Sequence, residues 1–161
     1  MTSTTNIGRT PVADALTDLL LTLFRANNRT LTWGDRLVAP LGLTSARWQV
    51  LGAIVAAGQP QPVAWLARDL GANRQNVQRI INDLRRAGLV AFAPNPHHRR
   101  AHLVVLTEKG RCTYDEAIRR YDAEVNVLAE GVPPEDIATA RRVLTLLRAR
   151  LEGDGSGGKG G

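Results

Sequence analysis

Residues 63–84 place small and apolar side chains at intervals that fit two short helices joined by one tight turn. Ala67 is followed four residues later by Gly71, and six residues after that by Val77. A small residue at the first position lets two helices cross closely, and glycine tolerates the positive φ of a sharp turn. This is the spacing of a helix-turn-helix, whose second helix would begin after an N-capping Asn73. The two expected apolar stripes are Val63, Leu66, Ala67 and Leu70, and then Val77, Ile80, Ile81 and Leu84.

The polar face of the second predicted helix differs from an ordinary solvated helix surface. At roughly 100° per residue, four side chains lie opposite the apolar stripe, namely Gln75, Gln78, Arg79 and Asn82. A merely solvated helix usually carries lysine and glutamate there as ion pairs. Glutamine, asparagine and arginine instead form paired hydrogen bonds with base edges in the DNA major groove. We therefore expect this face to read DNA, with Arg74, Gln75 and Gln78 entering the groove most deeply.

The positive charge of the chain is concentrated around these helices. Residues 66–111 hold nine Arg or Lys and three acidic residues, whereas the rest of the chain holds twelve of each. The whole net charge of +6 therefore lies in this block. Such a block is expected where a protein binds a polyanion, although basic side chains can also simply solvate a helical surface. The pattern of the polar face favours the first alternative, with double-stranded DNA as the partner.

A β-hairpin is predicted directly after the second helix. Leu89 to Ala93 and His102 to Leu106 each have the pattern of a short strand, and the segment between them is rich in proline and cations. Arg99 and Arg100 would lie at the tip of the hairpin. There they can enter an adjacent minor groove, whose negative potential favours arginine. The alternative is an ordinary turn whose charges contact phosphates.

Amphipathic helices flank this central module. The first is predicted from about Pro11 to Thr30 and is followed by a short segment broken by proline and glycine. A second helix begins after an N-capping Thr44 and ends at Gly58. Pro62 is well placed as the first residue of the helix that follows.

Two further helices are predicted after the hairpin. Thr107 can cap a long helix, which the GVPPED segment ends, and Pro134 opens the last helix. First-turn acids, Glu135 and Asp136, suit the positive end of its dipole. Five apolar residues at steps of three and four form a short seam along it, namely Ile137, Ala140, Leu144, Leu147 and Leu151. Such a seam is either ordinary core or, together with the first helix, a shared helical dimer interface.

The order of these motifs resembles the MarR family of bacterial winged-helix repressors. The matching segments are LGLTSARWQVLGAI, PVAWLARDLGANRQNVQRIINDLRRAGLV and NPHHRRAHLVVLTEKG, and the resemblance covers about residues 12–151. It implies a mainly α fold with a small β-hairpin wing, that is, a winged helix-turn-helix with N- and C-terminal dimerisation helices. It also implies a homodimer that represses transcription from an inverted-repeat operator and releases the DNA when a small, often aromatic, ligand binds.

The expected organisation follows from these segments. We expect a single domain over 11–152, with dimerisation helices at 11–32 and 108–152 and the winged helix-turn-helix at 44–107. Residues 1–10 are polar and residues 153–161 are glycine-rich, so both ends are expected to be disordered. The chain has no long apolar run and no secretory signal pattern, which favours a cytoplasmic protein with no membrane segment.

Three residues are candidates for the ligand site. Trp33 and Trp48 lie in the region where the family's ligand crevice forms, and Arg36 can meet an anionic group. A flat aromatic anion would stack on indole and pair with the guanidinium, although both tryptophans can equally fill the core. Trp65 lies opposite the apolar stripe of its helix, and it either packs under a neighbouring helix or lines the crevice.

One wing position departs from the family pattern. An aspartate commonly precedes the two basic residues of the wing, and here His98 stands in its place. The aspartate helps to hold the wing, so this wing lacks that support. The histidine is also expected to make DNA affinity depend on pH.

Other kinds of chemistry have little support in the sequence. His97, His98 and His102 fall in or beside one predicted turn, a poor arrangement for tetrahedral coordination, so no metal and no cofactor is expected. The single cysteine, Cys112, excludes an intrachain disulfide and is expected to be a buried, inert thiol. No phosphate loop, nucleophile–base pair or zinc-protease motif is present, which disfavours an enzyme. The other alternative to a ligand-responsive regulator is an architectural DNA-binding module.

Overall fold

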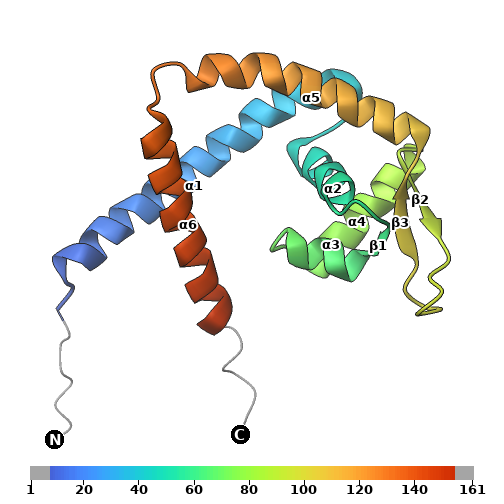
Figure 1. Cartoon of the computed structure of the whole chain (residues 1–161), viewed down its shortest axis with the longest axis horizontal. Helices are drawn as coiled ribbons and strands as arrows, with labels where there is room; N and C mark the ends of the chain where they lie inside the picture. Colours follow the sequence, from blue (N-terminus) through green and yellow to red (C-terminus); the bar gives the residue numbers. More distant parts are fainter. Residues whose placement is uncertain (1–7, 155–161) are drawn as a thin grey trace, which may run out of the picture. The chain divides into compact units, whose positions relative to one another are not determined.

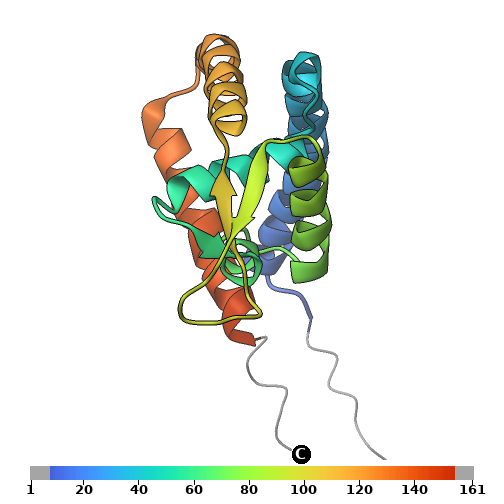
Figure 2. The same cartoon turned by 90° about the vertical axis from the view of Figure 1, so that its right-hand side faces the viewer.

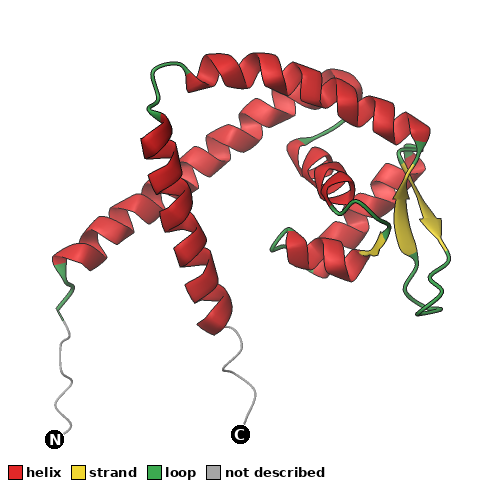
Figure 3. Ribbon diagram, in the orientation of Figure 1, coloured by secondary structure: helices red, strands yellow, loops and turns green. Residues whose placement is uncertain are grey.

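The computed structural model describes residues 8–154 and is mainly helical, with one small antiparallel sheet (Figure 3). The chain divides into two compact units, Met1–Tyr121 and Asp122–Gly161. The predicted fold class, a mainly α winged helix-turn-helix, is confirmed. Over the described part of the chain, no helix is long and apolar enough to cross a membrane.

The elements follow one another in the order labelled in Figure 1. The helices of the first unit are α1 (Pro11–Val38), a short 3-10 helix (Ala39–Leu41), α2 (Ser45–Ala56), α3 (Val63–Asp69) and α4 (Arg74–Arg86). The strands are β1 (Gln61–Pro62), β2 (Val90–Ala93) and β3 (Leu103–Leu106). Two long helices follow, α5 (Glu108–Ala129) and α6 (Pro134–Asp154).

The core of the first unit lies among α2, α3, α4 and the sheet. Each of these elements contributes side chains that are 0–1% exposed, namely Leu51, Leu66, Ile81, Leu84 and Val104. The stripe predicted for the second helix of the helix-turn-helix is buried in full, while Leu70 at the end of the first stripe is partly buried against the core. The apolar spacing therefore sets which face of α4 is turned inward.

Helix α1 continues to Val38, so the prediction of a helix end near Thr30 is wrong. Contacts with the start of α2 account for the difference. The Ser45 hydroxyl donates to the Leu31 carbonyl at 2.7 Å, and the Ser45 N–H donates to the Asp35 carboxylate at 2.6 Å. Because these bonds join two different helices, the local sequence pattern around residue 30 holds no sign of them.

The wing is the hairpin formed by β2 and β3. Its antiparallel register pairs Val90 with Leu106 and Ala93 with Leu103, and the connecting loop continues beyond the ends of the two strands (Figure 2). Both strands begin one residue later than the predicted starts at positions 89 and 102.

A third strand, β1, was not predicted. It pairs with β3 through Gln61 opposite Val104 and Pro62 opposite Leu103. Pro62 is the N-cap residue of α3 with an extended backbone, φ −66° and ψ 153°, and not its first helical residue as predicted. A strand of two residues has too little pattern to be visible in a sequence. Its proline lies at a sheet edge, where a missing N–H is tolerated.

The wing is joined to α5 through a close contact at Gly110. Thr107 caps α5 as predicted, because its hydroxyl accepts from the Gly110 N–H at 3.0 Å, and the same hydroxyl donates to the Gly88 carbonyl at 2.7 Å. The Thr107 N–H donates to the Leu89 carbonyl at 3.1 Å. A Cβ atom at position 110 would lie only 1.9 Å from that carbonyl oxygen, so the junction requires glycine.

We predict that Gly110→Ala destabilises the fold by about 2 kcal/mol or more, because the added methyl group forces α5 away from Leu89. Gly52→Ala is the matched control. It is also a helical glycine, but its Cβ would make only an ordinary contact, 3.7 Å from the Tyr114 ring. The control should be neutral or stabilising by up to about 1 kcal/mol, since alanine is the better helix former. Urea denaturation measures both values, and equal stability of the two variants would contradict the prediction.

Parts of the two predicted disordered ends are ordered. Thr10 caps α1 by accepting from the Ala13 N–H at 3.1 Å, and Arg9 forms an ion pair with Asp14 at 3.5 Å. At the other end α6 extends to Asp154. The remaining residues of these predicted segments, 1–7 and 155–161, lie outside the described residues.

Cys112 is exposed, so the prediction of a buried thiol is wrong. The buried positions of α5 are Gly110 and Ala117. At 3.6 residues per turn, position 112 lies on another side of the helix and faces solvent.

Candidate nucleic-acid interface

Helix α4 begins as the sequence predicted. The side chain of Asn73 accepts from the N–H groups of Gln75 at 2.8 Å and Asn76 at 3.3 Å, which satisfies two free donors of the first turn. Gly71 has a φ of +60°, so it makes the turn between α3 and α4 in the left-handed conformation that favours glycine. These local features place the start of α4 at the end of the turn, with its first residues exposed.

The predicted reading face of α4 is turned away from the core. Arg74, Gln75 and Arg79 are exposed, and Gln78 and Asn82 are half-buried. Gln78 donates from its amide to the Asn82 side-chain oxygen at 3.2 Å. This bond leaves the Gln78 carbonyl oxygen and the Asn82 amide N–H groups available to a partner.

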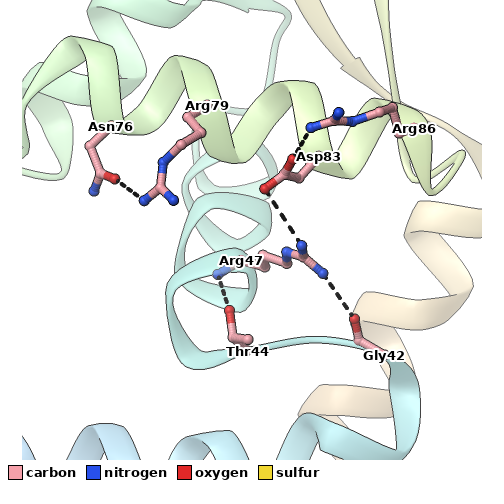
Figure 4. Close-up of polar contacts among 7 residues, drawn as sticks. All are labelled: Gly42, Thr44, Arg47, Asn76, Arg79, Asp83 and Arg86. Carbon is pink, nitrogen blue, oxygen red and sulfur yellow. Dashed lines mark hydrogen bonds and ion pairs between the residues drawn. The ribbon is translucent and has the colours of Figure 1, made fainter.

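Arg79 is held by Asn76, which was not a predicted site residue. Its guanidinium donates to the Asn76 side-chain oxygen at 2.8 Å (Figure 4). One guanidinium nitrogen is thereby engaged, while the group keeps further donors for a partner. The spacing of three residues on a helix is a signal that could have found this pair.

A second polar cluster connects α4 to α2 and to the turn before it (Figure 4). Asp83 forms ion pairs with Arg86 on its own helix and with Arg47 of α2, the latter at 3.5 Å. Arg47 also donates to the Gly42 carbonyl at 3.5 Å. The Arg86 hydrogen bond and charge, followed by the Arg47 charge, hold the pKa of Asp83 below its ordinary value of 3.8. Neither Arg47 nor Asp83 was a predicted site residue, because their contact joins distant parts of the sequence.

We predict that Asp83 makes stability depend on pH in the acid range. A carboxylate whose pKa is lowered by folding stabilises the fold above its unfolded-state pKa, and this stabilisation is lost as the pH falls through the folded-state pKa. Asp83→Asn should therefore lower the free energy of unfolding at neutral pH. Its free energy of unfolding should also fall less steeply than that of the wild type below about pH 5.

Denaturant unfolding at a series of pH values measures this difference. Arg47→Gln removes one of the two cationic partners of Asp83. It should remove only part of the pH dependence that Asp83 causes, since Arg86 remains. Parallel pH profiles for the wild type and Asp83→Asn would contradict the prediction.

The wing loop is closed by Asn95. Its amide donates to the Ala101 carbonyl at 2.9 Å, and its side-chain oxygen accepts from the His97 N–H at 3.0 Å. Two backbone bonds, from His98 to the Asn95 carbonyl and from Ala101 to the His98 carbonyl, tighten the same loop. Asn95 therefore provides a support for the wing that does not need an aspartate at position 98.

The side chains at the wing tip are open to solvent. Arg99, Arg100, His97 and His98 are all exposed. His102 is exposed as well, and its ring lies beside Phe92 of β2, with ring centroids 5.9 Å apart. Within residues 8–154, no group of three or more His, Cys, Asp or Glu side chains is arranged to hold a metal ion.

The predicted ligand residues lie partly in an aromatic cluster. Trp33 and Trp48 each meet Tyr121 of α5 edge to face, at ring-centroid distances of 5.8 Å and 5.4 Å. Arg36 is exposed in the last turn of α1. Tyr121 was not a predicted site residue, since nothing local to α5 indicates which rings it meets.

Comparison with known proteins agrees with this geometry. A model of the MarR family matches residues 41–101. An uncharacterised protein of Mycobacterium tuberculosis is 34% identical over 142 residues, which cover 86% of this chain and 98% of that protein. The transcriptional activatory protein BadR of Rhodopseudomonas palustris is 37% identical over 115 residues, 66% of this chain and 65% of BadR.

The fold is also found in solved structures. CouR of Rhodococcus jostii RHA1, in a crystal structure with p-coumaroyl-CoA bound, matches with a TM-score of 0.72 and 25% identity. The match covers 81% of this chain and 91% of CouR. The chain belongs to the MarR family of winged helix-turn-helix transcription regulators.

Proposed function

We propose that this regulator binds an inverted-repeat operator as a homodimer, represses the adjacent promoter and leaves the DNA when a small aromatic anion binds. The observation that carries the proposal is the exposed face of α4. It presents amide and guanidinium groups that hydrogen bonds hold in place, on a helix whose opposite face is buried. Such groups read base edges in the major groove.

The helix and the wing have different tasks in this proposal. Arg74, Gln75 and Gln78 enter the major groove at the N-terminal end of α4, and Arg79 and Asn82 contact bases or phosphates further along. Within the described residues, no hydrogen bond or ion pair restrains Arg99 or Arg100, and they follow the adjacent minor groove. Base contacts then provide specificity, while the wing provides affinity that does not depend on sequence.

We predict that Arg79→Ala and Gln75→Ala each cost about 1–3 kcal/mol on the cognate site and relax the preference at one base position of each half-site. Arg99→Ala and Arg100→Ala should instead weaken binding to all sequences alike and lower the salt dependence by about one unit per lost phosphate contact. A duplex selected from a randomised pool provides the cognate site, and fluorescence anisotropy at several salt concentrations measures affinity. If the α4 variants kept the wild-type ratio of cognate to random affinity, base reading by this face would be refuted.

The proposed dimer is supported by apolar side chains that the single chain leaves exposed. On α6, Ile137 is 50% exposed, Leu144 37% and Leu151 70%; on α1, Val12 is 78% exposed and Phe24 65%. Exposed apolar area of this kind favours association with another chain. A twofold dimer would place two α4 helices about one helical turn apart, roughly 10 base pairs, which matches an inverted repeat.

We predict a dimer at micromolar concentration in sedimentation equilibrium, and a shift toward monomer with weaker operator binding for Leu144→Glu. The matched control is Ala149→Glu, which adds the same charge five residues away, roughly 140° around the helix. The control should stay dimeric. A wild-type chain that sediments as a stable monomer would rule the proposal out.

The proposed ligand site is the region of Trp33, Arg36 and Trp48. Its aromatic rings can stack on a flat ring, and the exposed guanidinium can take a carboxylate through two hydrogen bonds. A CouR structure contains p-coumaroyl-CoA, an aromatic compound with negative charges, which supports this ligand class for a related protein.

We predict that salicylate, used as the probe, quenches tryptophan fluorescence and lowers operator affinity about tenfold, which needs about 1.4 kcal/mol of differential binding. Linkage requires operator DNA to weaken salicylate binding by the same factor. Arg36→Gln should weaken salicylate binding and leave operator affinity without salicylate unchanged. Two results would contradict this proposal: no quenching at millimolar salicylate, or the same salicylate affinity with and without operator. Either result would mean that the ligand switch lies elsewhere in the protein, or that the protein is an architectural DNA-binding module.

The repressor role depends on where the operator lies. A dimer over a promoter excludes the polymerase, whereas one upstream of it can support activation, as the name of BadR indicates for that protein. In vitro transcription from the chain's own promoter region tests the direction. Lower transcript levels with added protein are expected.

A further inference from the structure

A cavity of about 690 Å³ lies between the start of α4, helix α3 and the wing loop. Ala64 and Trp65 of α3 form part of its lining, Arg74 lines it from α4, and His97 and His98 line it from the wing. Two of its walls, the start of α4 and the wing loop, are therefore the elements that the proposed function brings to DNA. Among the described residues, none that lines the cavity is acidic.

Trp65 is an unusual residue in this cavity. Its side chain is 51% exposed, and among the described residues the other large exposed apolar side chains lie on α1, α5, α6 or the α5–α6 connection. It does not pack under a neighbouring helix, which was one of the two alternatives for this residue. The guanidinium carbon of Arg68 lies 5.5 Å from the centre of the indole ring, so the aromatic surface has a cation beside it.

We propose that one sugar–phosphate strand of the bound duplex lies in this cavity, with Trp65 against a deoxyribose ring. The inference rests on the proposed function. If α4 occupies a major groove and the wing occupies the adjacent minor groove, the strand that separates the two grooves has to cross between them. The cavity is the space between those elements.

The chemistry of the lining fits such a strand. A sugar–phosphate backbone alternates apolar rings with anionic groups. The flat face of Trp65 covers a sugar, while the imidazole N–H groups of His97 and His98 in the lining, and Arg68 beside the indole, face phosphates. This contact is independent of base sequence, and it makes Trp65 a DNA-binding residue.

The first test uses Trp65→Ala and Trp65→Phe on the selected duplex and on a scrambled duplex of the same length. Trp65→Ala should lower affinity about tenfold on both, and Trp65→Phe should retain most of it. Because the indole is uncharged, the slope of affinity against salt should stay that of the wild type, unlike the slope for Arg99→Ala, which should fall by about one unit. The emission of Trp65, obtained as the difference between wild type and Trp65→Phe, should shift to the blue with either duplex.

The second test changes the charge of the cavity at Ala64, an exposed residue in the first turn of α3. Ala64→Glu should lower affinity for both duplexes at least about tenfold, since it places a carboxylate against phosphates. Ala64→Lys should raise affinity and steepen the salt dependence by about one unit. An acid in the first turn of a helix favours the helix, so Ala64→Glu is expected to keep the fold.

Ala46→Glu is the matched control, because Ala46 is exposed and is the second residue of α2, as Ala64 is of α3. It should bind both duplexes as the wild type does.

If Trp65→Ala and Ala64→Glu bind within twofold of the wild type while Arg79→Ala loses discrimination, the strand is not in the cavity and the proposed function stands. If the emission of Trp65 does not change with either duplex but changes with 2-naphthoate, the inference is overturned and the cavity is a small-molecule site. A wild type that binds no duplex specifically would defeat the proposed function itself.

Discussion

The burial of one face of α4 is the constraint on which the candidate site depends. Ile81 and Leu84 are fully buried against α2, α3 and the sheet, and Val77 is 1% exposed. Burying an aliphatic side chain of this size contributes about 1.5–3 kcal/mol, far more than a solvent-exposed ion pair. The core therefore decides how α4 is rotated, and helical geometry then leaves Gln75 and Arg79 outside. The polar contacts of Asn76 and Asp83 only adjust side chains on a helix that is already oriented.

The wing depends on a different kind of constraint, since it has little core of its own. Its base is fixed where Thr107 and Gly110 meet the Leu89 carbonyl, and its loop is closed by the hydrogen bonds of Asn95. Between these two points, no hydrogen bond or ion pair in the described part of the chain orders the exposed arginines of the loop. The backbone of the hairpin is therefore fixed, while the charged side chains of its loop are not. Such side chains suit contacts with phosphates better than the reading of individual bases.

The parts of the fold that depend on neighbouring residues were predictable, and the parts that depend on distant contacts were not. The spacing of Ala67, Gly71 and Val77 predicted the helix-turn-helix and the face that α4 exposes. The end of α1 was missed because Ser45 of another helix holds its last turns, and β1 was missed because only its partner strand defines it. The same limit applies to the site. The contact of Asn76 with Arg79 could have been predicted from their three-residue spacing on a helix. The contacts of Arg47 with Asp83 and of Tyr121 with two tryptophans appear only in the folded chain.

On the proposed function, ligand and DNA must act on a part of the protein that both sites contact. Helix α2 is such a part, because Trp48 meets Tyr121 and the preceding residue, Arg47, meets Asp83 of α4. The Arg47–Asp83 pair is partly exposed and therefore weak, so breaking it alone does not free a DNA-bound helix. The buried side chains shared by α2 and α4 are the stronger connection, and they resist separation of the two helices. A ligand at the aromatic cluster would therefore act by moving α2 and α4 together, which shifts a whole reading face out of the groove and leaves its internal geometry intact.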